Sequence, residues 1–111
     1  MTVRRESYEI IERSSETIAA AVRQVFAKKS SYKTIRELER NRLFKVRIKP
    51  YWWLDSTSMT VILDEIKGYG TKVVVQTKSP ILTFGDVFDC YRHYIQDFLK
   101  DLKESIDYAP D

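Results

Sequence analysis

The stretch that decides the fold is residues 86–106, DVFDCYRHYIQDFLKDLKESI. Asp86 is placed to cap a helix, and the spacing of the apolar residues keeps one face of it dry for about six turns, or roughly 30 Å. A helix of this length with a wide apolar face needs a sheet or a second helix to cover it. The residues on that face are Phe88, Tyr91, Ile95, Phe98, Leu99, Leu102 and Ile106.

The residues before this helix favour antiparallel strands. Residues 43–49 alternate strictly, with Phe44, Val46 and Ile48 separated by cations, which is typical of a half-buried strand. Pro50 brings no backbone donor for a ladder and is predicted to end this strand.

A hairpin is predicted directly before the helix. Residues 59–66 and 71–77 are rich in β-branched side chains, and Gly68 and Gly70 lie in the turn between them. A further strand, with a less regular pattern, is predicted at residues 33–40.

The N-terminal part of the chain predicts a strand at residues 7–12, followed by a helix. Ser14 and Ser15 offer hydroxyl groups that can cap the helix, and Glu16 lies in its first turn, where the helix dipole favours an anion. The apolar residues of this helix have helical spacing and are Ile18, Val22, Val25 and Phe26.

The predicted fold class is therefore α+β, with the order β-α-β-β-β-β-α. Short connections favour an antiparallel sheet of four to five strands, with the long C-terminal helix and a shorter N-terminal helix on one face. We expect residues 1–111 to form a single domain with a frayed tail at 107–111. The predicted core is Phe44, Val46, Ile48, Val61, Val73, Val75, Ile95, Phe98 and Leu102.

Composition limits the class of protein. Apolar residues at 43% and charged residues at 32% argue against a disordered chain. The longest apolar run, at residues 18–22, is too short to cross a bilayer, and residues 1–6 have no signal-peptide pattern. The single cysteine, Cys90, suits a reducing compartment, so we expect a cytoplasmic protein without a membrane span.

The order of elements resembles a helix-grip domain of the START/SRPBCC superfamily. The resemblance is carried by Lys72-Val73-Val74-Val75, by Phe84-Gly85-Asp86 and by the amphipathic helix that follows. In that fold, a long C-terminal helix lies across a curved antiparallel sheet and closes a cavity. The resemblance implies a non-catalytic binder of an apolar small molecule or lipid, and it carries over no catalytic residue.

An aromatic cluster follows Pro50. Because Trp52 and Trp53 are adjacent, an extended backbone directs them to opposite faces, so one can pack in the core while the other lies at a rim. The alternative is that both cover the end of the long helix. The predicted ligand-binding residues, between the sheet and the C-terminal helix, are Tyr51, Trp52, Trp53 and Phe98.

Uneven charge supports two other partners. Residues 1–53 carry a net charge of +7 and residues 54–111 a net charge of −4, so a homodimer or another protein partner is the first alternative. Single-stranded nucleic acid on the basic strand 43–49 is the second. We expect no nucleic-acid binding, because Glu37 and Glu39 would repel phosphates and the strand supplies only about three contacts.

The sequence favours no catalytic site, metal site or cofactor. Cys90 and His93 lie three residues apart on the long helix, but the chain has no other Cys or His to complete a metal site. Asp64 and Glu65 are adjacent on a strand and face opposite ways, so they cannot act as a carboxylate pair. We therefore expect a protein that is not an enzyme.

Overall fold

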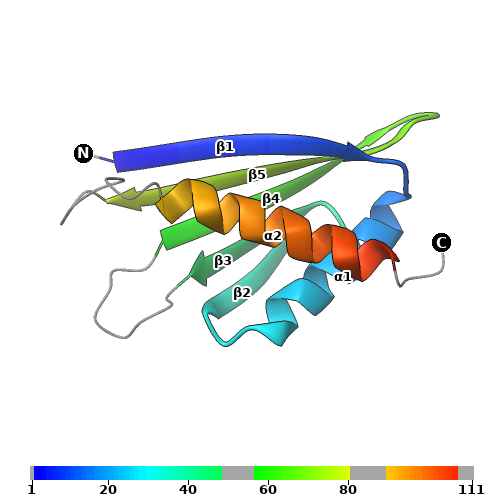
Figure 1. The fold of residues 1–111 in the computed structure, drawn as a ribbon. Coiled ribbons are helices and arrows are strands. Elements are labelled where there is room, and N and C mark those ends of the chain that lie inside the picture. Colours follow the sequence, from blue (N-terminus) through cyan, green and yellow to red (C-terminus); the bar gives the residue numbers. More distant parts are fainter. Residues whose placement is uncertain (1, 49–56, 81–89, 108–111) are drawn as a thin grey trace.

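The computed structural model describes residues 2–48, 57–80 and 90–107, which form five strands and two helices (Figure 1). The order of these elements is the predicted one. Pro50 and residues 108–111 of the expected frayed tail lie outside the described residues. The elements are β1 (Thr2–Ile11), α1 (Ser15–Lys28), β2 (Tyr32–Glu39), β3 (Leu43–Ile48), β4 (Thr57–Ile66), β5 (Gly70–Pro80) and α2 (Cys90–Asp107).

The strands form one antiparallel sheet in the order β1-β5-β4-β3-β2. Strands β2 to β5 follow one another as a meander, and β1 joins the sheet beside β5. Both helices cover the same face of the sheet, with α2 lying along it (Figure 1). The α+β class and the common face of the two helices are confirmed.

Helix α1 begins where the sequence predicts. Ser14 is the N-cap, and its Oγ accepts a hydrogen bond of 3.3 Å from the backbone N–H of Thr17. Glu16 in the first turn and Lys28 in the last turn both interact favourably with the helix dipole. The apolar face of α1 is fully buried against the sheet and α2.

Strand β1 is longer than predicted, because it starts at Thr2 rather than at residue 7. It pairs with β5 over its whole length, from Thr2 opposite Pro80 to Ile11 opposite Thr71. Residues 2–6 show no apolar alternation, since Arg5 is directed to the same face of the sheet as the buried Thr77 opposite it. Pairing with β5, and not a buried apolar face, defines this part of the strand.

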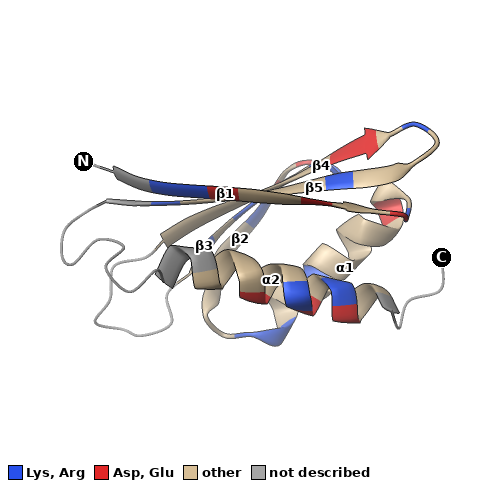
Figure 2. Cartoon of the chain, turned by 45° about the horizontal axis from the view of Figure 1, so that its top comes forward, with Lys and Arg blue, Asp and Glu red and all other residues tan. Residues whose placement is uncertain are grey.

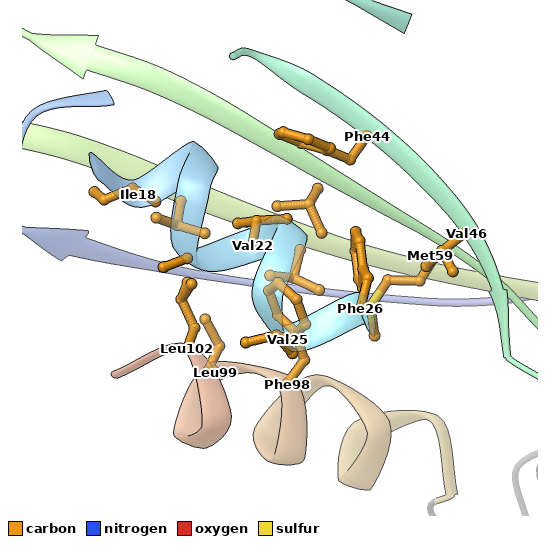
Figure 3. Packing of buried hydrophobic residues seen from close by; sticks show 14 of the residues in the cluster. Ile18, Val22, Val25, Phe26, Phe44, Val46, Met59, Phe98, Leu99 and Leu102 are labelled. Atoms are coloured by element: carbon orange, nitrogen blue, oxygen red, sulfur yellow. The ribbon is translucent and has the colours of Figure 1, made fainter. Parts of the chain in front are cut away.

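The core lies between the sheet and the helices (Figure 3). All nine predicted core residues are buried. Phe26 of α1 is at the centre, with ring centroids 5.4 Å from Phe98 of α2, 5.2 Å from Tyr32 and 6.3 Å from Phe44. Such aromatic contacts add to the stabilisation that burial of apolar area provides.

Neither helix of the described residues combines the length and apolar character needed to cross a bilayer.

Burial of Tyr32 makes stability sensitive to alkaline pH. Desolvation, and then the negative charges of Asp101 and Asp97, raise the pKa of the Tyr32 phenol above its ordinary value of 10.0. A raised pKa in the folded state means that the unfolded chain loses this proton first. The free energy of unfolding should therefore fall as pH rises above about 10. Urea titrations between about pH 8 and 12 should show a smaller fall for Tyr32→Phe than for the wild type, and equal falls would contradict the assignment.

Candidate functional site

The sheet has two distinct faces, which we call the inner face, packed against the helices, and the outer face. The inner face is apolar in its middle and carries threonines toward its ends. Thr71 and Thr77 of β5 and Thr57 of β4 are all buried on it. Buried hydroxyl groups need hydrogen-bond partners. A threonine on this face whose hydroxyl lacks a partner is therefore a candidate for ligand binding.

The two buried threonines of β5 differ in their partners. The hydroxyl of Thr71 donates to the backbone carbonyl of Arg13 at 3.0 Å. Thr77 is 1% exposed, and its hydroxyl has no hydrogen-bond partner among residues 2–48, 57–80 and 90–107. An unsatisfied buried hydroxyl costs about 1–3 kcal/mol. Thr77 lies opposite Met59 and Arg5, in the half of the inner face that the N-terminal part of α2 approaches (Figure 1).

Polar contacts link α2 to β1 and to α1. Lys103 of α2 donates to Glu9 of β1 at 2.6 Å, and Ser105 donates to Gln24 of α1 at 2.9 Å. The second pair is partly buried. These contacts fix α2 relative to β1 and α1 at the C-terminal part of the helix. These contacts could not be predicted from the sequence, because their partners are far apart in the chain.

The predicted ligand-binding residues are only partly described. Tyr51, Trp52 and Trp53 lie outside the described residues. Phe98 is fully buried and packs against Phe26, so it belongs to the core (Figure 3). Contact of these four residues with a ligand stays a prediction.

The outer face carries a groove of about 930 Å³. Cationic side chains of β1, β3 and β5 line the groove, and hydroxyl and amide groups lie between them. The cationic, hydroxyl and amide residues of the outer face that line the groove are Arg4, Lys45, Ser58, Thr60, Gln76 and Lys78. Register explains the assembly, because Arg4 lies opposite Lys78 and Lys45 opposite Thr60.

The acidic residues of β2 are held by neighbouring cations. Arg23 of α1 donates to Glu37 at 2.5 Å, and the backbone N–H of Asn41 donates to the same carboxylate at 2.8 Å. The hydrogen bond from Arg23, and then that from Asn41, lower the pKa of Glu37 from its ordinary value. Arg42 Nη1 lies 4.0 Å from Glu39 Oε2. The negative charge of Glu37 is thus offset locally, whereas Glu39 stays exposed.

Cys90 and His93 both lie in the N-terminal part of α2. The His93 side chain is exposed on α2, and Cys90 is the first residue of that helix. Within residues 2–48, 57–80 and 90–107, no group of three or more His, Cys, Asp or Glu residues could hold a metal ion. Asp64 and Glu65 of β4 lie opposite Lys72 and Thr71 respectively, so their side chains are directed to opposite faces.

Several solved structures share the fold of this chain. A protein from Chromobacterium violaceum, CV1439, superposes with a TM-score of 0.65 at 13% identity, over 99% of each chain. Ara h 8.0201 gives a TM-score of 0.56 at 11% identity, over 98% of this chain and 100% of that one. One further match is the di-domain ARO/CYC protein BexL of the BE-7585A biosynthetic pathway, with a TM-score of 0.58 at 12% identity. It is matched over 99% of this chain and 50% of its own.

These likenesses concern the fold alone. The sequence matches no protein-family model and no curated protein. The arrangement expected of a helix-grip domain, a C-terminal helix lying across an antiparallel sheet, is present. Membership of the START/SRPBCC superfamily stays a prediction.

Proposed function

We propose that this chain is a non-catalytic binding module for an apolar small molecule or lipid, held between the inner face and α2. The observation that carries the proposal is the buried hydroxyl of Thr77, which has no hydrogen-bond partner in the described part of the chain. A hydroxyl that costs stability in the unliganded protein is understandable if a ligand atom accepts or donates its hydrogen bond. The ligand would then have an apolar body and one polar group.

The fold supports this interpretation. Pockets for small molecules are lined mainly by apolar side chains, with a few polar groups that fix the orientation of the ligand. The inner face offers Thr77 with Met59 opposite it on β4, and Ile95 is buried on α2, which covers this face. Tyr51, Trp52 and Trp53 would lie at the mouth, and Phe98 would close the inner end.

Binding can be tested with Nile red, a neutral environment-sensitive dye that the cationic outer face would not attract. We expect a saturable rise in fluorescence that 1-dodecanol, with one hydroxyl group and an apolar chain, reverses. Because Trp52 and Trp53 are the two tryptophans of the chain, 1-dodecanol should also change the intrinsic emission. The proposal would be wrong if neither signal saturates.

Thr77→Val separates ligand binding from stability. Valine has the shape of threonine without the hydroxyl, so this variant should unfold at the same or a higher temperature than the wild type. It should also bind 1-dodecanol about fivefold to tenfold more weakly, which corresponds to one lost hydrogen bond of about 1–1.4 kcal/mol.

Thr71→Val is the matched control for this experiment. It removes the hydrogen bond to Arg13, so it should lower the free energy of unfolding by about 1 kcal/mol and leave the affinity for 1-dodecanol unchanged. Equal affinities of the Thr77→Val variant and the wild type would remove the support that Thr77 gives to the site.

A further inference from the structure

On the outer face, one row of side chains crosses all five strands, and four of its five members are cations. Arg4 of β1 lies opposite Lys78 of β5, which lies opposite Ser58 of β4. Ser58 in turn lies opposite Arg47 of β3, and Arg47 lies opposite Lys33 of β2. Neighbouring strands are about 4.8 Å apart, so this cationic row (Arg4, Lys78, Arg47 and Lys33) extends for about 19 Å.

The cationic row is not neutralised by the described part of the chain. Its four members are exposed, as are Lys45 and Arg36 in the next row, and none of these six forms an ion pair with a residue in the described part of the chain. Figure 2 shows Lys and Arg on β1 and along β2 and β3. On the helix side the situation differs, because Arg23, Lys29 and Lys103 are all paired with carboxylates.

Two further rows follow the cationic row across the sheet. The second contains Gln76 and Thr60 between Glu6 and Lys45, so amide and hydroxyl groups lie in the groove of about 930 Å³. The third is apolar and consists of Tyr8, Val74, Ile62 and Leu43. Tyr8 is 59% exposed, and Lys72 Nζ lies 4.7 Å from the centroid of its ring.

We propose that the outer face binds single-stranded nucleic acid, with phosphates along the cationic row and bases directed across the groove toward Tyr8. Positive charges follow a nucleic-acid backbone, polar groups bond base edges, and an exposed aromatic ring with a nearby cation stacks on a base. A flat membrane would meet the cations without entering the groove. An acidic protein segment would leave the exposed ring of Tyr8 without a specific role.

The structure changes the sequence argument against this partner in the number of cations and in the position of Glu37, whereas Glu39 lies opposite Leu43 on the outer face. The basic strand 43–49 does not act alone, because register adds Arg4 and Lys78 from distant parts of the chain. Glu37, which was expected to repel phosphates, lies opposite Phe44 on the inner side and is bound by Arg23. The apolar ligand is proposed for the opposite, inner face, and Thr77 of that face also contributes to the lining of the groove.

The test is fluorescence anisotropy of fluorescein-labelled oligothymidine, titrated at about 50 to 200 mM salt. Four phosphate contacts predict a slope of about −3 for the logarithm of the binding constant against that of the salt concentration. The double variant Arg47→Glu, Lys78→Glu should weaken binding more than about tenfold at the lower salt concentration. Tyr8→Ala should weaken binding about fivefold and leave the slope unchanged, because stacking releases no counterions.

The control is the double variant Lys28→Glu, Lys100→Glu on the helices, which changes the net charge equally. Both of its lysines are exposed. It should bind within about twofold of the wild type, and melting curves should show that all variants fold. No binding at the lower salt concentration, or equal weakening by both double variants, would overturn the proposal. Equal or tighter binding of polyglutamate or of phosphatidylserine vesicles would overturn it in favour of an acidic protein or a membrane surface.

Discussion

A Phe98→Ala variant is expected to lose about 3–5 kcal/mol of unfolding free energy. Phe98 is 0% exposed, and its ring packs on that of Phe26, the centre of the aromatic core. Truncation to alanine removes the transfer free energy of the ring and leaves a cavity that the sheet and α1 can fill only in part. Because small domains are stable by about 5–15 kcal/mol in total, this single change should bring the chain close to unfolding.

Urea titration followed by circular dichroism measures this loss. The matched control is Tyr69→Ala, since Tyr69 is 72% exposed at the turn between β4 and β5. It should change the free energy of unfolding by less than about 0.5 kcal/mol. A Phe98→Ala variant as stable as the wild type would contradict the packing described for α2.

A Gly70→Ala variant is expected to lose at least about 2 kcal/mol, with a fall in melting temperature of about 10 °C. Gly70 has φ +137°, which residues with a side chain rarely adopt. A Cβ at this position would overlap the carbonyl oxygen of Ile11 and lie 2.8 Å from Glu12 Cα. Those atoms belong to the backbone at the end of β1, so no side-chain rotation can make room.

Gly68 provides the control within the same turn. It has φ +83° and no atom within 4 Å of the position that a Cβ would occupy. Gly68→Ala should therefore cost only the left-handed backbone conformation, about 1 kcal/mol. Thermal melting of the two variants side by side measures the difference. Equal melting temperatures would mean that the approach of Gly70 to β1 is looser than described.

The fold could be predicted because its decisive signals are local. Helical spacing of apolar residues marked α1 and α2, and the strict alternation of residues 43–49 marked β3. The N-cap at Ser14 and the turn before Gly70 were equally visible, because caps and turns depend on residues that are close in sequence. The first half of β1 was missed because its inner side carries Arg5 instead of an apolar residue.

The candidate sites depend on register, which the sequence does not reveal. Lys78 could be expected beside the cations of strand 43–49, but Arg4 looks like an isolated cation until pairing of β1 with β5 places it opposite Lys78. Thr71 and Thr77 look alike on one strand, and only the position of the Arg13 carbonyl distinguishes them. The aromatic residues at 51–53 were the conspicuous signal, and the structure does not describe them.

The place of β1 beside β5 also bears on the synthesis of this protein. Among the five described strands, β1 is synthesised before the other four and pairs with β5, which is synthesised after them, since Thr2 pairs with Pro80. Strands β2 to β5 can pair with their neighbours in the order in which they emerge. The backbone N–H and C=O groups of β1 stay unpaired until β5 has been synthesised. Until β5 emerges, the nascent chain therefore presents an unpaired strand, which is the kind of segment that chaperones protect from aggregation.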